Sequence, residues 1–105
     1  MTALDLIKKL PHALDQGAAA NAHCTLQFDI STPAYAVIHA GVCNISEGRA
    51  DSPDLALTLS DDDLIALLRG QLDGVTAFMT GRLKLQGDMT LAQRLGRLFD
   101  ASRLQ

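Results

Sequence analysis

The sequence predicts an α+β domain in which helices cover one face of a five-stranded, mainly antiparallel sheet. Four β-like segments come early, between residues 22 and 59, and a fifth lies between helical segments at 82–86. Helical spacing of apolar residues marks both ends of the chain. Strands that cluster before helices are typical of α+β proteins. A length of 105 residues suits one core, so we expect a single domain over 1–105.

The first segment, residues 2–14, is expected to be helical because Thr2 is a good N-cap and apolar residues recur at helical spacing. These residues are Leu4, Ile7, Leu10 and Leu14. Pro11 cannot donate a backbone hydrogen bond, so it should kink this helix or divide it into two pieces. Gly17 then marks the exit.

Residues 22–30 alternate between apolar and polar and therefore predict a half-buried strand. Its apolar positions are Ala22, Cys24, Leu26, Phe28 and Ile30, and its polar positions are His23, Thr25, Gln27 and Asp29. Two more β-like runs, 35–40 and 42–47, flank Gly41, which favours a tight hairpin or a bulge. Residues 48–53 read as a loop, and alternation at 55–59 predicts a fourth strand.

Ser60 is expected to cap a helix whose first turn carries Asp61, Asp62 and Asp63, where the helix dipole favours carboxylates. Its apolar stripe is Leu64, Leu67 and Leu68, and Gly70 ends it. A short helix follows over 73–80, then the fifth strand. Asp88 caps a last helix, and its apolar stripe is Leu91, Leu95, Leu98 and Phe99.

Composition indicates a globular chain with an aliphatic core, since 48% of residues are hydrophobic and only four are aromatic. The formal net charge of −3 argues against nucleic-acid binding, and we interpret Arg94, Arg97 and Arg103 as a solvated helix face. Residues 1–14 include charged side chains and Pro11, which interrupt any apolar leader. We therefore expect a cytoplasmic protein.

Catalytic motifs are missing from the sequence: it has no Gly-rich phosphate loop, no G-x-S-x-G and no HExxH. The histidines, His12, His23 and His39, are scattered over different elements. His39 and Cys43 form a weak nucleophile-pair candidate, a pair that would act on acyl thioesters. We expect no metal site at Asp61–Asp63, because adjacent helix positions point in different directions, and we expect Cys24 and Cys43 to be free thiols rather than a disulfide.

The second half of the chain resembles the sterol carrier protein 2 family. The residues that carry the resemblance are Asp54-Leu-Ala-Leu-Thr-Leu-Ser-Asp-Asp-Asp-Leu64, Gly70 and Phe78-Met-Thr-Gly-Arg-Leu-Lys-Leu-Gln-Gly-Asp-Met89. The similarity is specific over 54–99 and weaker over 22–48. Ser102-Arg103-Leu104 is similar to the peroxisomal address of eukaryotic members, but Gln105 follows and such an address must be terminal.

The resemblance implies a non-catalytic protein without a cofactor, with an apolar tunnel between sheet and helices. The implied ligand is a fatty acyl chain, an acyl-CoA, a phospholipid or a sterol or isoprenoid. We predict that the ligand contacts eight residues: Phe28, Val75, Phe78, Met79, Leu83, Leu85, Leu95 and Phe99. Expected partners are this lipid and, transiently, a membrane. The alternative is an accessory module that docks onto an enzyme of lipid or quinone metabolism.

Overall fold

The computed structural model describes residues 2–20 and 22–99, without the side chains of 18 and 95–97. Its sheet has the strand order β3-β2-β1-β4-β5. The strands are β1 (His23–Asp29), β2 (Ala34–His39), β3 (Val42–Glu47), β4 (Leu55–Thr58) and β5 (Lys84–Gly87). β1 and β4 run parallel and the other three pairings are antiparallel, which confirms the predicted five-stranded, mainly antiparallel sheet.

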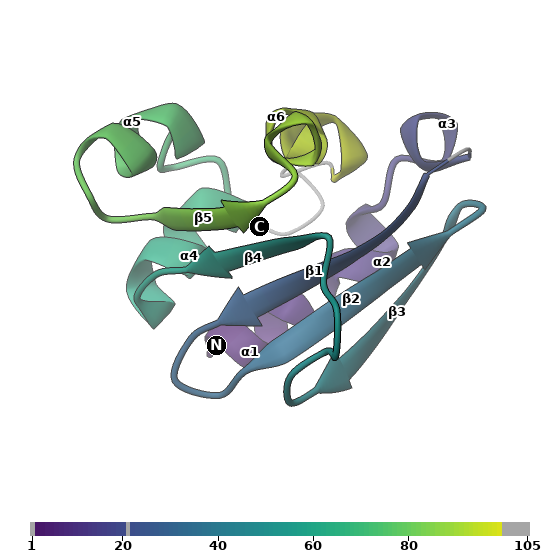
Figure 1. The fold of residues 1–105 in the computed structure, drawn as a ribbon, viewed down its shortest axis with the longest axis horizontal. Coiled ribbons are helices and arrows are strands. Elements are labelled where there is room, and N and C mark those ends of the chain that lie inside the picture. Colours follow the sequence, from purple (N-terminus) through teal and green to yellow (C-terminus); the bar gives the residue numbers. More distant parts are fainter. Residues whose placement is uncertain (1, 21, 100–105) are drawn as a thin grey trace.

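Helices α1, α2 and α4 lie behind the sheet in Figure 1, while α5, α6 and α3 follow its upper edge. The six are α1 (Ala3–Ile7), α2 (Leu10–Ala13), α3 (Gln16–Ala19), α4 (Asp61–Leu68), α5 (Gly74–Met79) and α6 (Met89–Leu98). None of the helices in the described ranges is both long and apolar enough to cross a bilayer.

The N-terminal segment divides into two helices, as one of the two effects expected of Pro11. α1 ends at Ile7, and Pro11 lies in the first turn of α2, where its missing N–H leaves no bond unmade. The exit predicted at Gly17 is wrong, because this glycine lies inside the short helix α3. Thr2 and Asp5 form a reciprocal capping box at the start of α1.

The core lies between α1, α2, α4 and the apolar face of the sheet. Its fully buried large side chains include Leu6, Ile7 and Leu10 from the helices. They meet the inward residues of the central strands, which are Leu26, Ile38, Leu55 and Leu57. Alternation at 22–30 and at 55–59 thus predicted the buried face of these two strands correctly.

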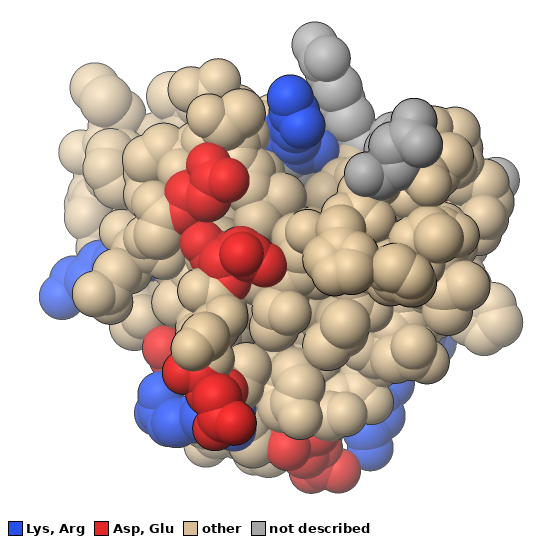
Figure 2. All heavy atoms as spheres, turned by 45° about the vertical axis from the view of Figure 1, so that its right-hand side comes forward, with Lys and Arg blue, Asp and Glu red and all other residues tan. Residues whose placement is uncertain are grey.

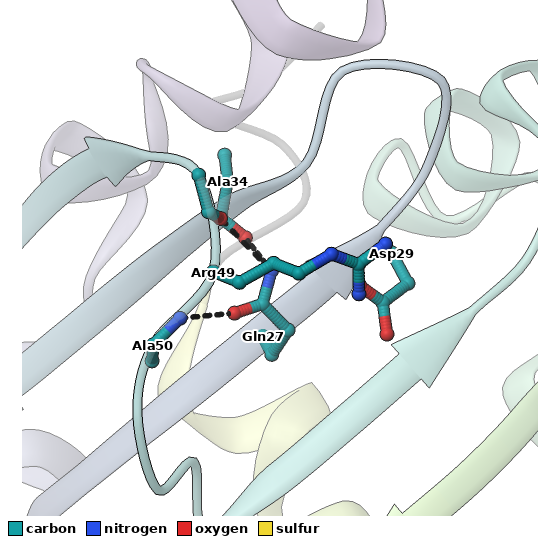
Figure 3. Close-up of polar contacts among 6 residues, drawn as sticks. Gln27, Asp29, Ala34, Arg49 and Ala50 are labelled. Carbon is teal, nitrogen blue, oxygen red and sulfur yellow. Dashed lines mark hydrogen bonds and ion pairs between the residues drawn. The ribbon is translucent and has the colours of Figure 1, made fainter.

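The loop at 48–53 is a crossover that passes over the other face of the sheet, and it buries Gln27, which the alternation pattern had placed on the polar face. The Gln27 amide donates to the carbonyls of Ala34 and Gly48, and its oxygen accepts from the N–H of Ala50 at 2.8 Å. Figure 3 shows this side chain beneath the loop, beside Arg49, which contacts Asp29 at 2.6 Å. Gln27 is only 3% exposed, because parallel pairing of β1 with β4 requires a crossover here.

Candidate ligand-binding site

α5 presents its large apolar side chains to solvent. Asp73 caps the helix by accepting from the N–H of Thr76, and Gly81 with φ of 79° follows its C-terminal end. Val75, Phe78 and Met79 are 70%, 50% and 78% exposed, whereas Ala77 is fully buried. The helix therefore packs through a small residue. We call Val75, Phe78 and Met79 the α5 apolar face.

The remaining predicted site residues lie against the core. Phe28 and Leu83 are buried, and Leu85 is half-buried on β5. Phe99 is half-buried and forms an isolated bridge with Leu14. The side chain of Leu95 lies outside the described part of the structure, as do Arg97 and Arg103 of the predicted arginine face.

The α5 apolar face and the site residues that lie against the core are joined by the connection from α5 to β5. The N–H groups of Arg82 and Leu83 both donate to the carbonyl of Ala77, at 2.9 and 3.0 Å. The backbone therefore turns sharply, carrying the chain from the exposed helix into the buried position of Leu83. Sequence periodicity identified the apolar residues of α5, but their outward orientation depends on packing that periodicity does not report.

The start of α4 is held to both neighbouring segments by carboxylates. Asp61 accepts from the backbone N–H of Ser31 at 2.9 Å and also from the Ser31 hydroxyl. Asp63 pairs with Arg82, next to α5. The hydrogen bonds from Ser31 lower the pKa of Asp61, and the Arg82 guanidinium lowers the pKa of Asp63. The acidic turn thus does more than cap a helix.

A recess of about 270 Å³ lies where α1 and α4 begin, beside the β1–β2 turn. Its lining is mixed: Leu4 and Ile30 are apolar, while the other four residues are polar, namely Thr2, Ser31, Thr32 and Asp61. No sequence pattern predicts this recess, because its walls come from three segments far apart in the chain. Its volume is at the lower end of small-molecule pockets.

The catalytic alternative finds no geometric support. In the β2–β3 register, His39 pairs with Val42 and Cys43 pairs with Ile38. Cys43 is therefore buried on the helix-covered face, while His39 is exposed on the opposite one. Burial also raises the pKa of the Cys43 thiol to about 11, so it stays protonated at neutral pH. His39 cannot activate this thiol across the sheet.

Cys24 and Cys43 are free and buried, as the sequence predicted. Both pair with Ile38, one from each side of β2, so this strand separates them. Burial raises the pKa of Cys24, and the nearby carboxylates Asp54 and Asp88 add to the shift. Two buried, protonated thiols act as small core residues.

Acidic side chains form a broken band down the face of the molecule shown in Figure 2, with basic side chains at its edges. The formal net charge of the chain is −3. A negative surface repels a phosphate backbone, so this face is unsuited to nucleic acid. Among the described residues, no group of three or more metal-ligating side chains comes together, and Asp61–Asp63 do not converge.

The amino-acid sequence matches the model of the SCP-2 sterol transfer family over residues 4–100. It is 40% identical over 52 residues to peroxisomal multifunctional enzyme A of Dictyostelium discoideum, covering 50% of the chain and 12% of that protein. It is 44% identical over 45 residues to sterol carrier protein 2 of Bos taurus, covering 43% of the chain and 8% of that protein. The chain thus spans a small part of these curated relatives.

Three solved structures share its fold. The inverting sec-alkylsulfatase of Pseudomonas superposes with a TM-score of 0.77 at 25% identity, over 90% of the chain and 16% of the enzyme. Palmitated SCP2L2 of Aedes aegypti superposes with a TM-score of 0.70 at 20% identity, over 92% of this chain and 93% of that protein. The UbiJ-SCP2 ubiquinone synthesis protein superposes with a TM-score of 0.72 at 17% identity, over 97% of this chain and 91% of that protein. The fold therefore occurs both as a small protein and as part of an enzyme.

Proposed function

The chain belongs to the SCP-2 sterol transfer family, and from this premise we propose that it binds and transfers a hydrophobic lipid in an apolar tunnel between its sheet and helices. The observation that carries the proposal is the α5 apolar face, three large side chains left in water beside a core that excludes water. Exposed apolar clusters of this kind mark binding surfaces. The ligand class is a fatty acyl chain, an acyl-CoA, a phospholipid or a sterol or isoprenoid.

Binding is driven by removal of apolar surface from water, on both the lipid and α5. A buried methylene contributes about 0.8 kcal/mol, so a sixteen-carbon chain gains on the order of 10 kcal/mol before association costs. Ordering of the lipid offsets much of this gain. The balance predicts micromolar affinity with little selectivity among hydrocarbon chains.

The predicted site residues have distinct roles in this proposal. Phe28, Leu83 and Leu85 form the sheet wall, and the α5 apolar face turns inward or is covered when lipid enters. Phe99, half-buried at the end of α6, closes the tunnel together with Leu95. In this proposal the chain is a carrier that neither catalyses a reaction nor uses a cofactor or nucleic acid.

The test uses delipidated protein and a fluorescent fatty acid, with mixed cell lipids as competitors and native mass spectrometry to identify what is retained. A triple variant, Val75→Ser, Phe78→Ser and Met79→Ser, should bind the probe at least about tenfold more weakly, because it removes the apolar surface that drives binding. Val42→Ser is the control, because Val42 is 55% exposed on the face of the sheet opposite α1, α2 and α4. Equal affinity of wild type and triple variant, or a wild type that retains no lipid, would refute the proposal.

A second candidate is an accessory module that docks onto an enzyme of lipid or quinone metabolism. It is supported by the relatives in which the part similar to this chain makes up 12% or 16% of a larger enzyme. Co-purification with one stoichiometric enzyme, together with a lipid-free protein, would favour this function over transport. In the transport function we expect a cytoplasmic protein in transient contact with membranes, and sedimentation with vesicles tests that contact.

A further inference from the structure

Two of the histidines that the sequence scatters along the chain meet on the face of the sheet opposite α1, α2 and α4. His23 on β1 is the register partner of His39 on β2, and their Nδ1 atoms are 2.6 Å apart. The ring centroids are 4.5 Å apart with an interplanar angle of 85°. Both side chains are exposed, and the lipid-binding proposal uses neither of them.

The backbone brings this pair close and holds it there. The N–H of Ala40 donates to the carbonyl of Ala22, which makes His23 and His39 a non-hydrogen-bonded pair, the kind whose side chains approach more closely. Ala40 and Gly41 both have positive φ, 49° and 82°, as the two central residues of a tight hairpin. A non-glycine residue in this conformation is strained, so the turn fixes His39 in place.

We propose that His23 and His39 bind a divalent transition-metal ion of the class that prefers imidazole, which includes Zn²⁺, Ni²⁺ and Cu²⁺. With metal–nitrogen bonds of about 2.05 Å, two nitrogens of one ion lie roughly 2.9 Å apart in a square-planar site and roughly 3.3 Å apart in a tetrahedral one. To reach either value, the two rings must open from their present separation of 2.6 Å and turn so that both Nδ1 lone pairs face the ion.

The site leaves most of its coordination positions open. Its neighbours in the register of the described strands on the same face are Thr25, Val37 and Val42, of which none is a strong metal ligand. No third His, Cys, Asp or Glu completes a cluster among the described residues. Water or a donor from outside the chain fills the remaining positions, so the affinity is modest and set by the two imidazoles.

The test is a titration of the reduced, delipidated full chain with Zn²⁺, followed by calorimetry and by NMR of the histidine side-chain nitrogens. We expect one equivalent to bind with shifts at His23 and His39. His23→Gln and His39→Gln should each weaken binding at least about tenfold, and the double variant should abolish it, because each removes one metal–nitrogen bond. His12→Gln controls for ordinary surface histidines, and Cys24→Ala with Cys43→Ala controls for the thiols.

Both histidines are exposed, so the glutamine variants should keep the wild-type thermal midpoint without metal and retain fatty-acid binding. A double variant that binds Zn²⁺ like the wild type would overturn the proposal. So would a wild type that takes up no Zn²⁺, which would leave the pair as a hydrogen bond between two imidazoles. Neither result bears on the lipid-binding proposal, whose readout is separate.

Discussion

α1 and α5 are both short, well-capped helices with four apolar residues each, yet most of these residues are buried in α1 and exposed in α5. In α1, Leu6 and Ile7 are fully buried, and Ala3 is 2% exposed. In α5, the three residues of the α5 apolar face are all at least half exposed. Local helix formation is therefore alike in the two, and the difference lies in what each helix faces.

The comparison indicates that, in the proposed function, folding and lipid binding draw on separate apolar surfaces. Burial of a large aliphatic side chain contributes about 1.5–3 kcal/mol, so the α1 side chains stabilise the fold. The α5 apolar face contributes little to the fold, because water still covers it. In the proposed function, this surface is available to a bound lipid, and the separation leads to four predictions.

Leu6→Ala should cause the largest loss. Leu6 is fully buried, and truncation of such a side chain costs about 2–5 kcal/mol of unfolding free energy. Met79→Ala, at a position 78% exposed, should change the unfolding free energy by less than about 0.5 kcal/mol. Urea unfolding followed by circular dichroism measures both. Similar losses in the two variants would break the comparison, because α5 would then contribute to the core.

Sequence reasoning succeeded where one residue decides one local event. Ser60 and Asp88 cap their helices as predicted, and alternation located the strands predicted at 22–30 and 55–59. It missed features that depend on pairing between distant segments. The outward turn of α5 and the meeting of His23 with His39 follow from packing and register, which helical or strand periodicity does not encode.

Gln27→Leu should cause the second largest loss, about 1–3 kcal/mol, because it leaves buried backbone groups of the 48–53 crossover without a partner. This crossover connects β3 to β4, the strand that precedes α4. Gln86→Leu is the matched control, because Gln86 is exposed on the outer strand β5. The control should change the unfolding free energy by less than about 0.5 kcal/mol. Equal effects would mean that the Gln27 bonds do not hold the crossover.

Alkaline pH should lower the free energy of unfolding by a smaller amount, through the buried thiol of Cys43. The pKa of Cys43 is about 11 in the folded chain, against an ordinary value of 9.0. Between these values the unfolded chain loses its thiol proton and the folded chain keeps it, so unfolding free energy falls as pH rises from about 9 to about 11. In urea titrations, Cys43→Ala should reduce the fall of unfolding free energy with pH. Cys24→Ala should keep the part of this fall that comes from Cys43. An unchanged slope in Cys43→Ala would show that the thiol is not protected by burial.

Acid should produce the smallest loss of unfolding free energy. It acts on two carboxylates in the first turn of α4, which contact different parts of the chain. Asp61 bonds to Ser31 on the packed side, and Asp63 pairs with Arg82 on the α5 side. Both pKa values are lowered below 3.8, so both carboxylates stabilise the fold fully well above that pH. This stabilisation is lost as pH falls below 3.8 through the folded pKa values.

Asp61→Asn and Asp63→Asn each remove one part of this acid dependence. Amide hydrogen exchange shows which part of the chain each variant destabilises. Asp63→Asn should speed amide exchange in α5 and leave α1 unchanged, because the Arg82 pair is lost only there. Asp61→Asn should act on the β1–β2 turn instead, where Ser31 loses a charged acceptor. Both pairs are exposed to solvent, so each effect is small and weakens with salt. If Asp63→Asn instead speeds exchange equally in α1 and α5, the two helices belong to one cooperative unit, and the division between folding and binding surfaces fails.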